Sequence, residues 1–226
     1  MKYIPGYEEN VYGVDSLRKK GSFRFRQWGV TLEMIDEFIG EGGGREKFVG
    51  LSTREVNRQY MKPLTSLKHK TGTKGASYCS WKYQHRHSGV SDADAFGGHA
   101  WDGGFLDFID ALKFHIGEAE YSKTRLWIDI FCNNQHRDSS EHVKQHKSKY
   151  LTETLKKSME IFERFLVFFD NWTDPLVFHR AWSLVELHYG IESGLSLEMV
   201  LPRGDIRSFR DAISEEDPTK IPHNMF

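Results

Sequence analysis

The second half of the chain alternates short apolar runs with segments of helical periodicity. Apolar residues recur at helical spacing over residues 105–116 and again over residues 151–162. Apolar runs typical of buried strands occupy residues 126–131, 165–169 and 195–201. Strands that alternate with helices form βαβ units, so the sequence predicts a parallel sheet with helices on both faces.

Two further elements complete this α/β domain. Residues 95–98 are expected to form its first strand, and a helix is predicted over residues 177–189, with Gly190 at its end. Ligands of such sheets bind at the carboxyl ends of the strands. We therefore look for a site in the residues that follow strands 95–98, 126–131 and 165–169.

The first half of the chain shows weaker patterns. Thr31 is suited to cap a helix over residues 32–39, which Gly40 can end. A second helix is predicted from Thr53 and is expected to stop before Pro63.

Residues 68–93 are rich in Lys, His, Gly and Ser, and they are expected to form a loop. Residues 1–30 show no clear period. We therefore divide the chain into a mainly helical or irregular extension, residues 1–93, and an α/β domain, residues 94–226.

Composition narrows the functional classes. The 31 Lys and Arg residues balance 32 Asp and Glu residues, so no global positive field favours nucleic acid. Two cysteines cannot build a disulfide framework, and the N-terminus lacks the apolar stretch of a signal peptide. Nowhere do 18 apolar residues follow one another, as a membrane span requires. The sequence predicts a soluble, cytoplasmic protein that binds neither membrane nor nucleic acid.

A Gly-rich segment, FGGHAWDGG at residues 96–104, follows the first predicted strand. Glycines let backbone amides approach a phosphate or ribose, and the following helix N-terminus favours anions. The segment matches neither a Rossmann fingerprint nor a P-loop, and a tight strand-to-helix turn explains it equally well. The candidate binding residues are Gly98, His99 and Trp101.

Polar residues stand in and after the second predicted strand. Asp129 lies inside the run at residues 126–131, where a buried carboxylate needs a partner. Polar residues 133–136 follow directly, at the position of a ligand-facing loop, and make Asp129 and His136 candidates. A hydrogen bond that Asp129 accepts from a neighbouring backbone amide is an equally good explanation.

The segment HRAWSLVEL, residues 179–187, places Trp182 and Glu186 on one face of a helix. An indole beside a carboxylate can hold an aromatic or ribosyl ligand while the carboxylate accepts hydroxyl hydrogen bonds. Spacing alone favours a core Trp and a solvated Glu. The pair His142 and His146 has metal-binding spacing, but no acidic or thiol ligand completes a set, and no metal site is predicted.

Taken in order, these segments resemble the TIR domain family. The sequence WSLVEL at residues 182–187 is similar to the Trp-Cys-x-x-Glu-Leu signature, with Ser183 at the Cys position. Residues 96–101 resemble the Val-Ser-His-Ala-Trp strand of a protist and algal TIR-like subgroup, with Gly98 at the Ser position. The Leu-Trp-Ile-Asp and Arg-x-Trp-x-x-x-Glu patterns also resemble fungal heterokaryon-incompatibility (HET) domains. The resemblance covers about residues 94–205.

The resemblance implies a flavodoxin-like, TIR-type sheet and an NAD-cleaving activity in immune or stress signalling. Glu186 would be the catalytic residue, and NAD would be a substrate rather than a cofactor. Self-association through the TIR-like domain is also implied. The alternative is a non-catalytic TIR- or HET-like module that acts through homotypic contacts. Residues expected to contact the substrate are Trp182, Gly98, His99, Trp101, Asp129 and His136.

Overall fold

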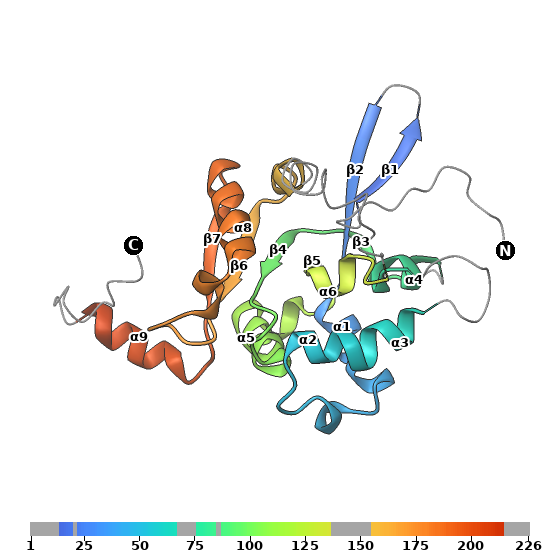
Figure 1. Cartoon of the computed structure of the whole chain (residues 1–226). Coiled ribbons are helices and arrows are strands. Elements are labelled where there is room, and N and C mark those ends of the chain that lie inside the picture. Colours follow the sequence, from blue (N-terminus) through green and yellow to red (C-terminus); the bar gives the residue numbers. More distant parts are fainter. Residues whose placement is uncertain (1–13, 20–21, 67–75, 85–86, 137–154, 215–226) are drawn as a thin grey trace.

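The computed structural model describes the chain except for residues 1–13, 20–21, 67–75, 85–86, 137–154 and 215–226. Four strands of the described part form one parallel sheet in the order β5-β4-β6-β7 (Figure 1). Numbered along the chain, this order is 2-1-3-4, as in flavodoxin-like folds, which confirms the predicted α/β class. The strands are β4 (Ala95–Gly98), β5 (Leu126–Trp127), β6 (Arg164–Phe168) and β7 (Ser196–Val200).

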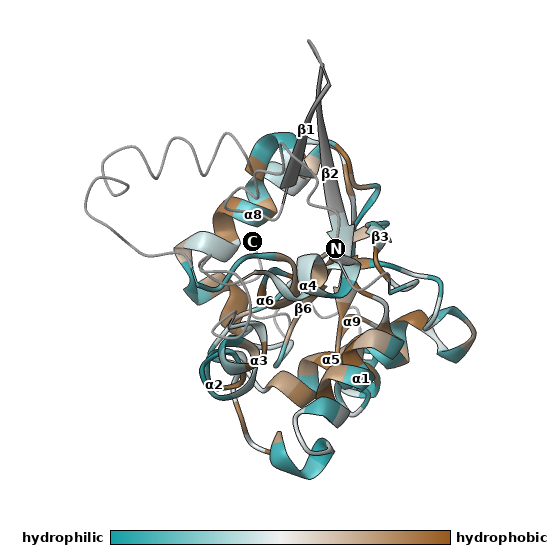
Figure 2. Cartoon of the chain, turned by 90° about the vertical axis from the view of Figure 1, so that its right-hand side faces the viewer, coloured by the Kyte–Doolittle hydropathy of each residue, from teal (hydrophilic) through white to brown (hydrophobic). Residues whose placement is uncertain are grey.

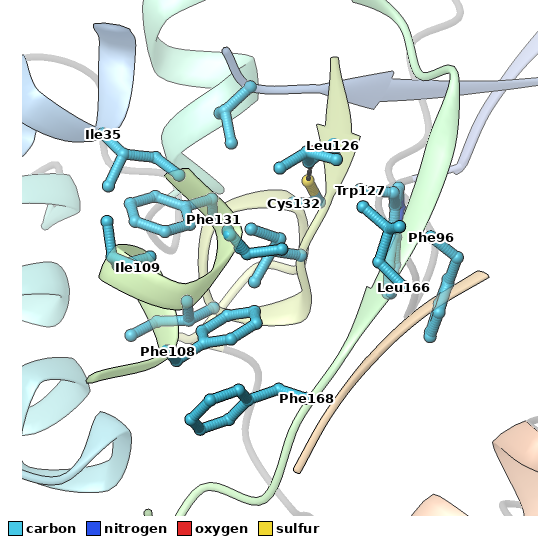
Figure 3. Packing of buried hydrophobic residues seen from close by; sticks show 14 of the residues in the cluster. Ile35, Phe96, Phe108, Ile109, Leu126, Trp127, Phe131, Cys132, Leu166 and Phe168 are labelled. Carbon is cyan, nitrogen blue, oxygen red and sulfur yellow. Dashed lines mark hydrogen bonds between the residues drawn. The ribbon is translucent and has the colours of Figure 1, made fainter. Parts of the chain in front are cut away.

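Helices cover both faces of this sheet. Helix α5 (Phe105–Ile116) lies on one face, where Phe108 contacts Phe168 of β6 with ring centroids 5.4 Å apart (Figure 3). Helix α8 (Ala181–Glu192) lies on the other face. A Cβ atom at Gly190 of α8 would lie 2.6 Å from the Phe165 ring, so glycine allows the helix to approach the sheet closely. The predicted helix over residues 105–116 and the strands at 95–98, 165–169 and 195–201 are therefore confirmed.

The core extends into the first half of the chain. Helix α1 (Leu32–Glu41) begins as predicted, because the Thr31 hydroxyl accepts a hydrogen bond from the Met34 amide at 3.3 Å. Phe38 of α1 meets Phe131 edge-on, with ring centroids 5.3 Å apart, and Ile35 points toward the same ring (Figure 3). One hydrophobic core therefore includes residues from both sides of position 94.

The chain before α1 also joins the sheet. Val30 and Leu126 exchange backbone hydrogen bonds of 2.9 and 2.8 Å at the outer edge of β5. Strand β2 (Ser22–Gly29) pairs with β1 (Val14–Lys19) and with β3 (Ser91–Asp92) in a second, antiparallel sheet. This sheet was not predicted, although the alternation Phe23-Arg24-Phe25-Arg26 within β2 is a strand signal.

The helical segment from Thr53 does not stop before Pro63. Helix α2 (Thr53–Val56) continues through a π-helical turn, η2 (Asn57–Met61), into α3 (Lys62–Thr65). The Lys62 amide donates to the Asn57 carbonyl, five residues earlier. The wider turn takes the chain out of the α-helical register that the Pro63 ring would obstruct, which explains the wrong prediction.

Two other predictions require correction, and a third is confirmed over its described residues. Residues 68–93 are not all loop, since α4 (Tyr78–Gln84) lies within them and buries Tyr78 and Cys79 in the core. The predicted helix at 177–189 is divided into η4 (Leu176–His179) and α8, which passes Gly190 and ends at Glu192. Of the segment 151–162, residues 155–159 are helical as predicted, and residues 151–154 lie outside the described part.

The remaining helices lie around this framework. They are η1 (Arg45–Lys47), η3 (Glu118–Glu120), α6 (Asp129–Cys132) and α9 (Asp205–Ser214). Hydrophilic and hydrophobic residues alternate along α1, α2 and α8 (Figure 2). No helix among the described residues has the length and apolar character that crossing a membrane requires.

Candidate functional site

Glu186 lies on the buried side of α8, with 6% of its surface exposed. It lines a narrow crevice with Gly98 and His99 at the end of β4 and with Phe165 and Val167 of β6. The strand order reverses between β4 and β6, which is where ligands bind in open α/β sheets. The crevice has no room for a water molecule, so a ligand reaches Glu186 only after its walls move.

Trp182 lies one helical turn before Glu186 on α8. Its side chain hydrogen-bonds to the Glu186 carboxyl group, an interaction that favours the ionised form of Glu186. The predicted pairing of the two residues on one helical face is confirmed. The prediction of a solvated Glu is wrong, because α8 packs this face against the sheet.

Asp129 occupies the first position of α6 rather than the interior of a strand. Strand β5 ends at Trp127, and the amides of Phe131 and Cys132 turn back to the Ile128 carbonyl at 3.0 and 2.9 Å. An apolar run cannot by itself distinguish a buried strand from a buried helical turn, which explains the wrong prediction for residues 126–131.

The Asp129 carboxylate connects two strand ends. Its Oδ2 atom accepts a hydrogen bond from the indole of Trp101, which lies in the loop after β4. Its Oδ1 atom is buried, and no described residue donates to it. A buried acceptor without a donor is costly, and such a group is suited to receive a hydroxyl from a ligand.

Asp129 and Glu186 form a buried carboxyl pair. Burial, together with the negative charge of Asp129, raises the pKa of Glu186 to about 8. Burial also raises the pKa of Asp129 to about 6, against hydrogen bonds that its carboxylate accepts from the Trp101 indole and the Ile130 backbone amide. The pKa of Glu186 is raised further than that of Asp129, so Glu186 is the member of the pair that favours its protonated form. Two carboxyl groups with separated pKa values can serve as an acid and a base in one site.

Three charged residues from α2, the loop after β4 and the N-cap of α8 bind one another, and the charge of Arg180 acts on the carboxyl pair of the crevice. Arg180, at the N-cap of α8, donates from Nη1 to Oδ2 of Asp102 at 2.9 Å. Arg54 of α2 donates from Nε to Oδ1 of the same carboxylate at 2.8 Å. We call Arg54, Asp102 and Arg180 the rim triad. The positive charge of Arg180 also favours the ionised form of both members of the carboxyl pair.

Sequence patterns indicate little of the rim triad. Arg180 occurs in the Arg-x-Trp pattern, but spacing did not assign it a role. Arg54 lies 48 residues from Asp102, and Arg180 lies 78 residues from it. Only the folded chain brings these residues together.

His99 borders the crevice, but its ring is held by neighbouring residues. The imidazole stacks on Phe108 with ring centroids 4.1 Å apart, and its Nε2 atom lies 3.0 Å from the Thr53 hydroxyl. Burial lowers the pKa of His99 to about 3, so the ring is neutral at physiological pH. His99 therefore cannot attract a phosphate through a positive charge in this structure.

His136 does not line the crevice. Its Nε2 atom lies 2.8 Å from the Thr65 hydroxyl of α3. The neighbouring Gln135 donates to the Asp129 carbonyl at 2.9 Å and accepts from Asn57 at 3.2 Å. This polar network supports α6 from the side of the π-helical turn and thereby positions Asp129.

Gly98 faces the ring of Phe165. A Cβ atom at position 98 would lie 2.5 Å from Cε2 of Phe165. The aromatic ring therefore fills the space that a serine side chain would occupy at this position. This packing accounts for glycine in place of the serine of the Val-Ser-His-Ala-Trp motif.

We expect Gly98→Ser to lower the free energy of unfolding by about 1–3 kcal/mol, because the added atoms overpack the core. Urea denaturation measures this loss. Gly204→Ser is the control, since a Cβ atom there meets nothing within 4 Å. Phe165→Leu in the Gly98→Ser background should recover part of the loss. A Gly98→Ser variant as stable as Gly204→Ser would contradict this packing argument.

Metal-binding residues do not gather in the described part of the chain. No group of three or more His, Cys, Asp or Glu side chains there could hold a metal ion. His142 and His146 lie outside the described residues.

Comparisons with known proteins give no match. No family model matches the chain. Neither the curated proteins nor the solved structures contain a significant match. The function is therefore inferred from the crevice and from the motifs that form it.

Proposed function

We propose that the chain is a TIR-like enzyme that cleaves the bond between nicotinamide and ribose in NAD. The main support is the position of Glu186 in a crevice at the point where the strand order reverses. The three segments that resemble TIR motifs meet there: the loop after β4, the end of β5, and α8. If the likeness of these short motifs were accidental, there would be no reason for the three segments to meet at one place.

In this proposal Glu186 stabilises the transition state. Nicotinamide leaves as a neutral molecule from a cationic ring, so no strong acid is needed. Positive charge develops on the ribose, and a nearby carboxylate lowers the energy of that oxocarbenium-like state. Glu186 must be ionised for this role. Entry of NAD opens the crevice, and the resulting solvation lowers the pKa of Glu186 and favours its carboxylate.

Neighbouring residues would position the substrate. Asp129 offers its unpartnered Oδ1 atom to a ribose hydroxyl, and Trp182 offers an indole face to the nicotinamide or ribose. Gly98, His99 and Trp101 border the path to the rest of the dinucleotide. Water as acceptor yields ADP-ribose, nicotinamide and a proton, whereas an internal nucleophile of the substrate yields a cyclic product and nicotinamide.

The biological setting is part of the same proposal. By resemblance we place the protein in the cytoplasm, in immune or stress signalling, with self-association through the TIR-like domain. The closed crevice favours a second candidate function, a non-catalytic TIR- or HET-like interaction module. Such a module keeps the fold without any need for Glu186 to meet a substrate.

Nicotinamide release from NAD distinguishes the two functions. We expect Glu186→Gln to lower the rate by at least about 100-fold, as for loss of one transition-state charge contact. Glu192→Gln is the matched control, because Glu192 lies on the same helix but is exposed and pairs with Lys156.

Equal release by the wild type and a folded Glu186→Gln variant would exclude Glu186 as the catalytic residue. Absence of release from the wild type, in both dilute and concentrated solution, would favour the interaction module. Chromatography of the products also separates ADP-ribose from a cyclic product.

A further inference from the structure

In the rim triad two arginines converge on one carboxylate. Arg54 and Arg180 come from different helices, and both donate to the Asp102 carboxylate, at 2.8 and 2.9 Å. The Arg54 guanidinium holds the pKa of Asp102 below its usual range. Two arginines that converge on one anion provide two sets of donors and an excess of one positive charge.

Stability alone does not account for this arrangement. The side chains of Arg54 and Asp102 are 57% and 59% exposed, and exposed ion pairs contribute at most about 1 kcal/mol. The backbone already fixes the loop, since the amides of Thr53 and Arg54 donate to the carbonyls of Gly103 and Trp101 at 3.2 and 3.0 Å. Arg54 and Asp102 are therefore accessible to a ligand, and the Arg180 side chain is 30% exposed.

The position of the triad relates it to the crevice. Asp102 directly follows Trp101, whose indole binds Asp129. Arg180 directly precedes α8, which carries Glu186, and its charge acts on both carboxyl groups. A ligand that extends from Glu186 past the N-terminus of α8 would meet Arg180, and Arg54 binds the same carboxylate as Arg180.

We propose that Arg54 and Arg180 bind the diphosphate of a dinucleotide whose ribose reaches Glu186. In the closed structure the Asp102 carboxylate occupies the place of this diphosphate. The inference rests on the proposed function and names a part of the same site. Guanidinium groups match phosphate oxygens in geometry, and a diphosphate offers more charge and more acceptors than one carboxylate. The ligand therefore displaces Asp102 from the two arginines.

Binding of ADP and of adenosine to the full-length chain tests this site without any cleavage. The two probes differ only in the diphosphate. Isothermal titration should show that Arg54→Gln weakens ADP binding by at least about tenfold and leaves adenosine binding unchanged. Arg45→Gln is the control, because Arg45 forms a comparably exposed ion pair with Asp110.

Asp102→Asn gives the sharper result, because its expected effect has the opposite sign. Removal of the competing carboxylate should tighten ADP binding several-fold. If the triad were only structural, this variant would bind ADP no better than the wild type. Unchanged or weaker ADP binding by folded Asp102→Asn, or equal effects of Arg54→Gln and Arg45→Gln, would overturn the proposal.

The two proposals fail in different ways. Diphosphate-dependent ADP binding by a protein that releases no nicotinamide would leave the anion site intact and remove the enzymatic function. Glu186-dependent nicotinamide release, with ADP and adenosine bound equally, would remove the anion site and leave the enzyme.

Discussion

Glu186→Gln should stabilise the protein at alkaline pH, although the proposed function predicts that it slows nicotinamide release by at least about 100-fold. Burial and Asp129 raise the pKa of Glu186 to about 8, far above its ordinary value. Each unit of pKa difference between the folded and unfolded states corresponds to about 1.4 kcal/mol. We expect the variant to exceed the wild type by roughly 3–5 kcal/mol in free energy of unfolding at about pH 9.

The direction in which wild-type stability changes with pH follows from the number of protons that each state binds. Between about pH 4.5 and 8 the unfolded state has released the Glu186 proton, whereas the folded state retains it. The unfolded state then binds fewer protons, so wild-type stability falls as the pH rises through this window. Glutamine carries no ionisable proton, and its amide oxygen can still accept the Trp182 hydrogen bond. The difference between the two proteins should therefore be small near pH 4.5 and constant above about pH 8.

Urea denaturation across this pH range measures the difference directly. Glu192→Gln is the control, because Glu192 is exposed and its carboxylate pairs with Lys156. A difference between wild type and Glu186→Gln that does not vary with pH would show that Glu186 does not titrate as a buried group. A stability gain at Glu186 would also indicate that the carboxyl group is retained for function, since it costs stability in the closed structure.

The sheet of this fold could be predicted from the sequence because its signals are local. The apolar run at residues 165–169 is long enough for a strand covered on both faces, and β6 lies there. Helix α5 follows from helical spacing, and the start of α1 follows from the capping residue Thr31. Each of these elements is specified by neighbours in the chain.

Elements that depend on tertiary contacts were predicted less well. Helix α4 lies in a segment rich in loop-forming residues, but Tyr78 and Cys79 are buried in the core, and burial outweighs the weak local preference. Residues 128–132 leave the sheet because their backbone closes a helical turn. The turn at Pro63 depends on a π-helical register that no sequence pattern indicates.

In the candidate site, too, some features follow from local sequence and others depend on tertiary contacts. The shared face of Trp182 and Glu186 follows from their spacing, and the structure contains it. The burial of Glu186 and its interaction with Asp129 do not follow, because α6 and α8 are separated by more than forty residues in the chain. The pKa values that distinguish this pair are a property of the packed sheet.

The second large effect concerns residues 1–93, which we expect to unfold together with the α/β domain. Phe38 of α1 is wholly buried, and its ring contacts Phe131 and Phe105 of the α/β part at centroid distances of 5.3 and 6.3 Å. Phe38→Ala should lower the free energy of unfolding by about 3–5 kcal/mol. Because the cavity opens in a core that both parts share, the whole transition should move to lower urea concentration.

Far-UV circular dichroism and tryptophan fluorescence together report on this cooperativity, since coincident curves indicate one transition. Phe114→Ala is the control, because Phe114 lies on α5 with 49% of its surface exposed and should change the free energy of unfolding far less. A Phe38→Ala variant in which an early transition separates from an unchanged late one would show that residues 94–226 fold independently. Coincident, shifted curves would mean that the parallel sheet depends on α1 for its core, so that a fragment beginning at residue 94 would lack the contacts that bury Phe131.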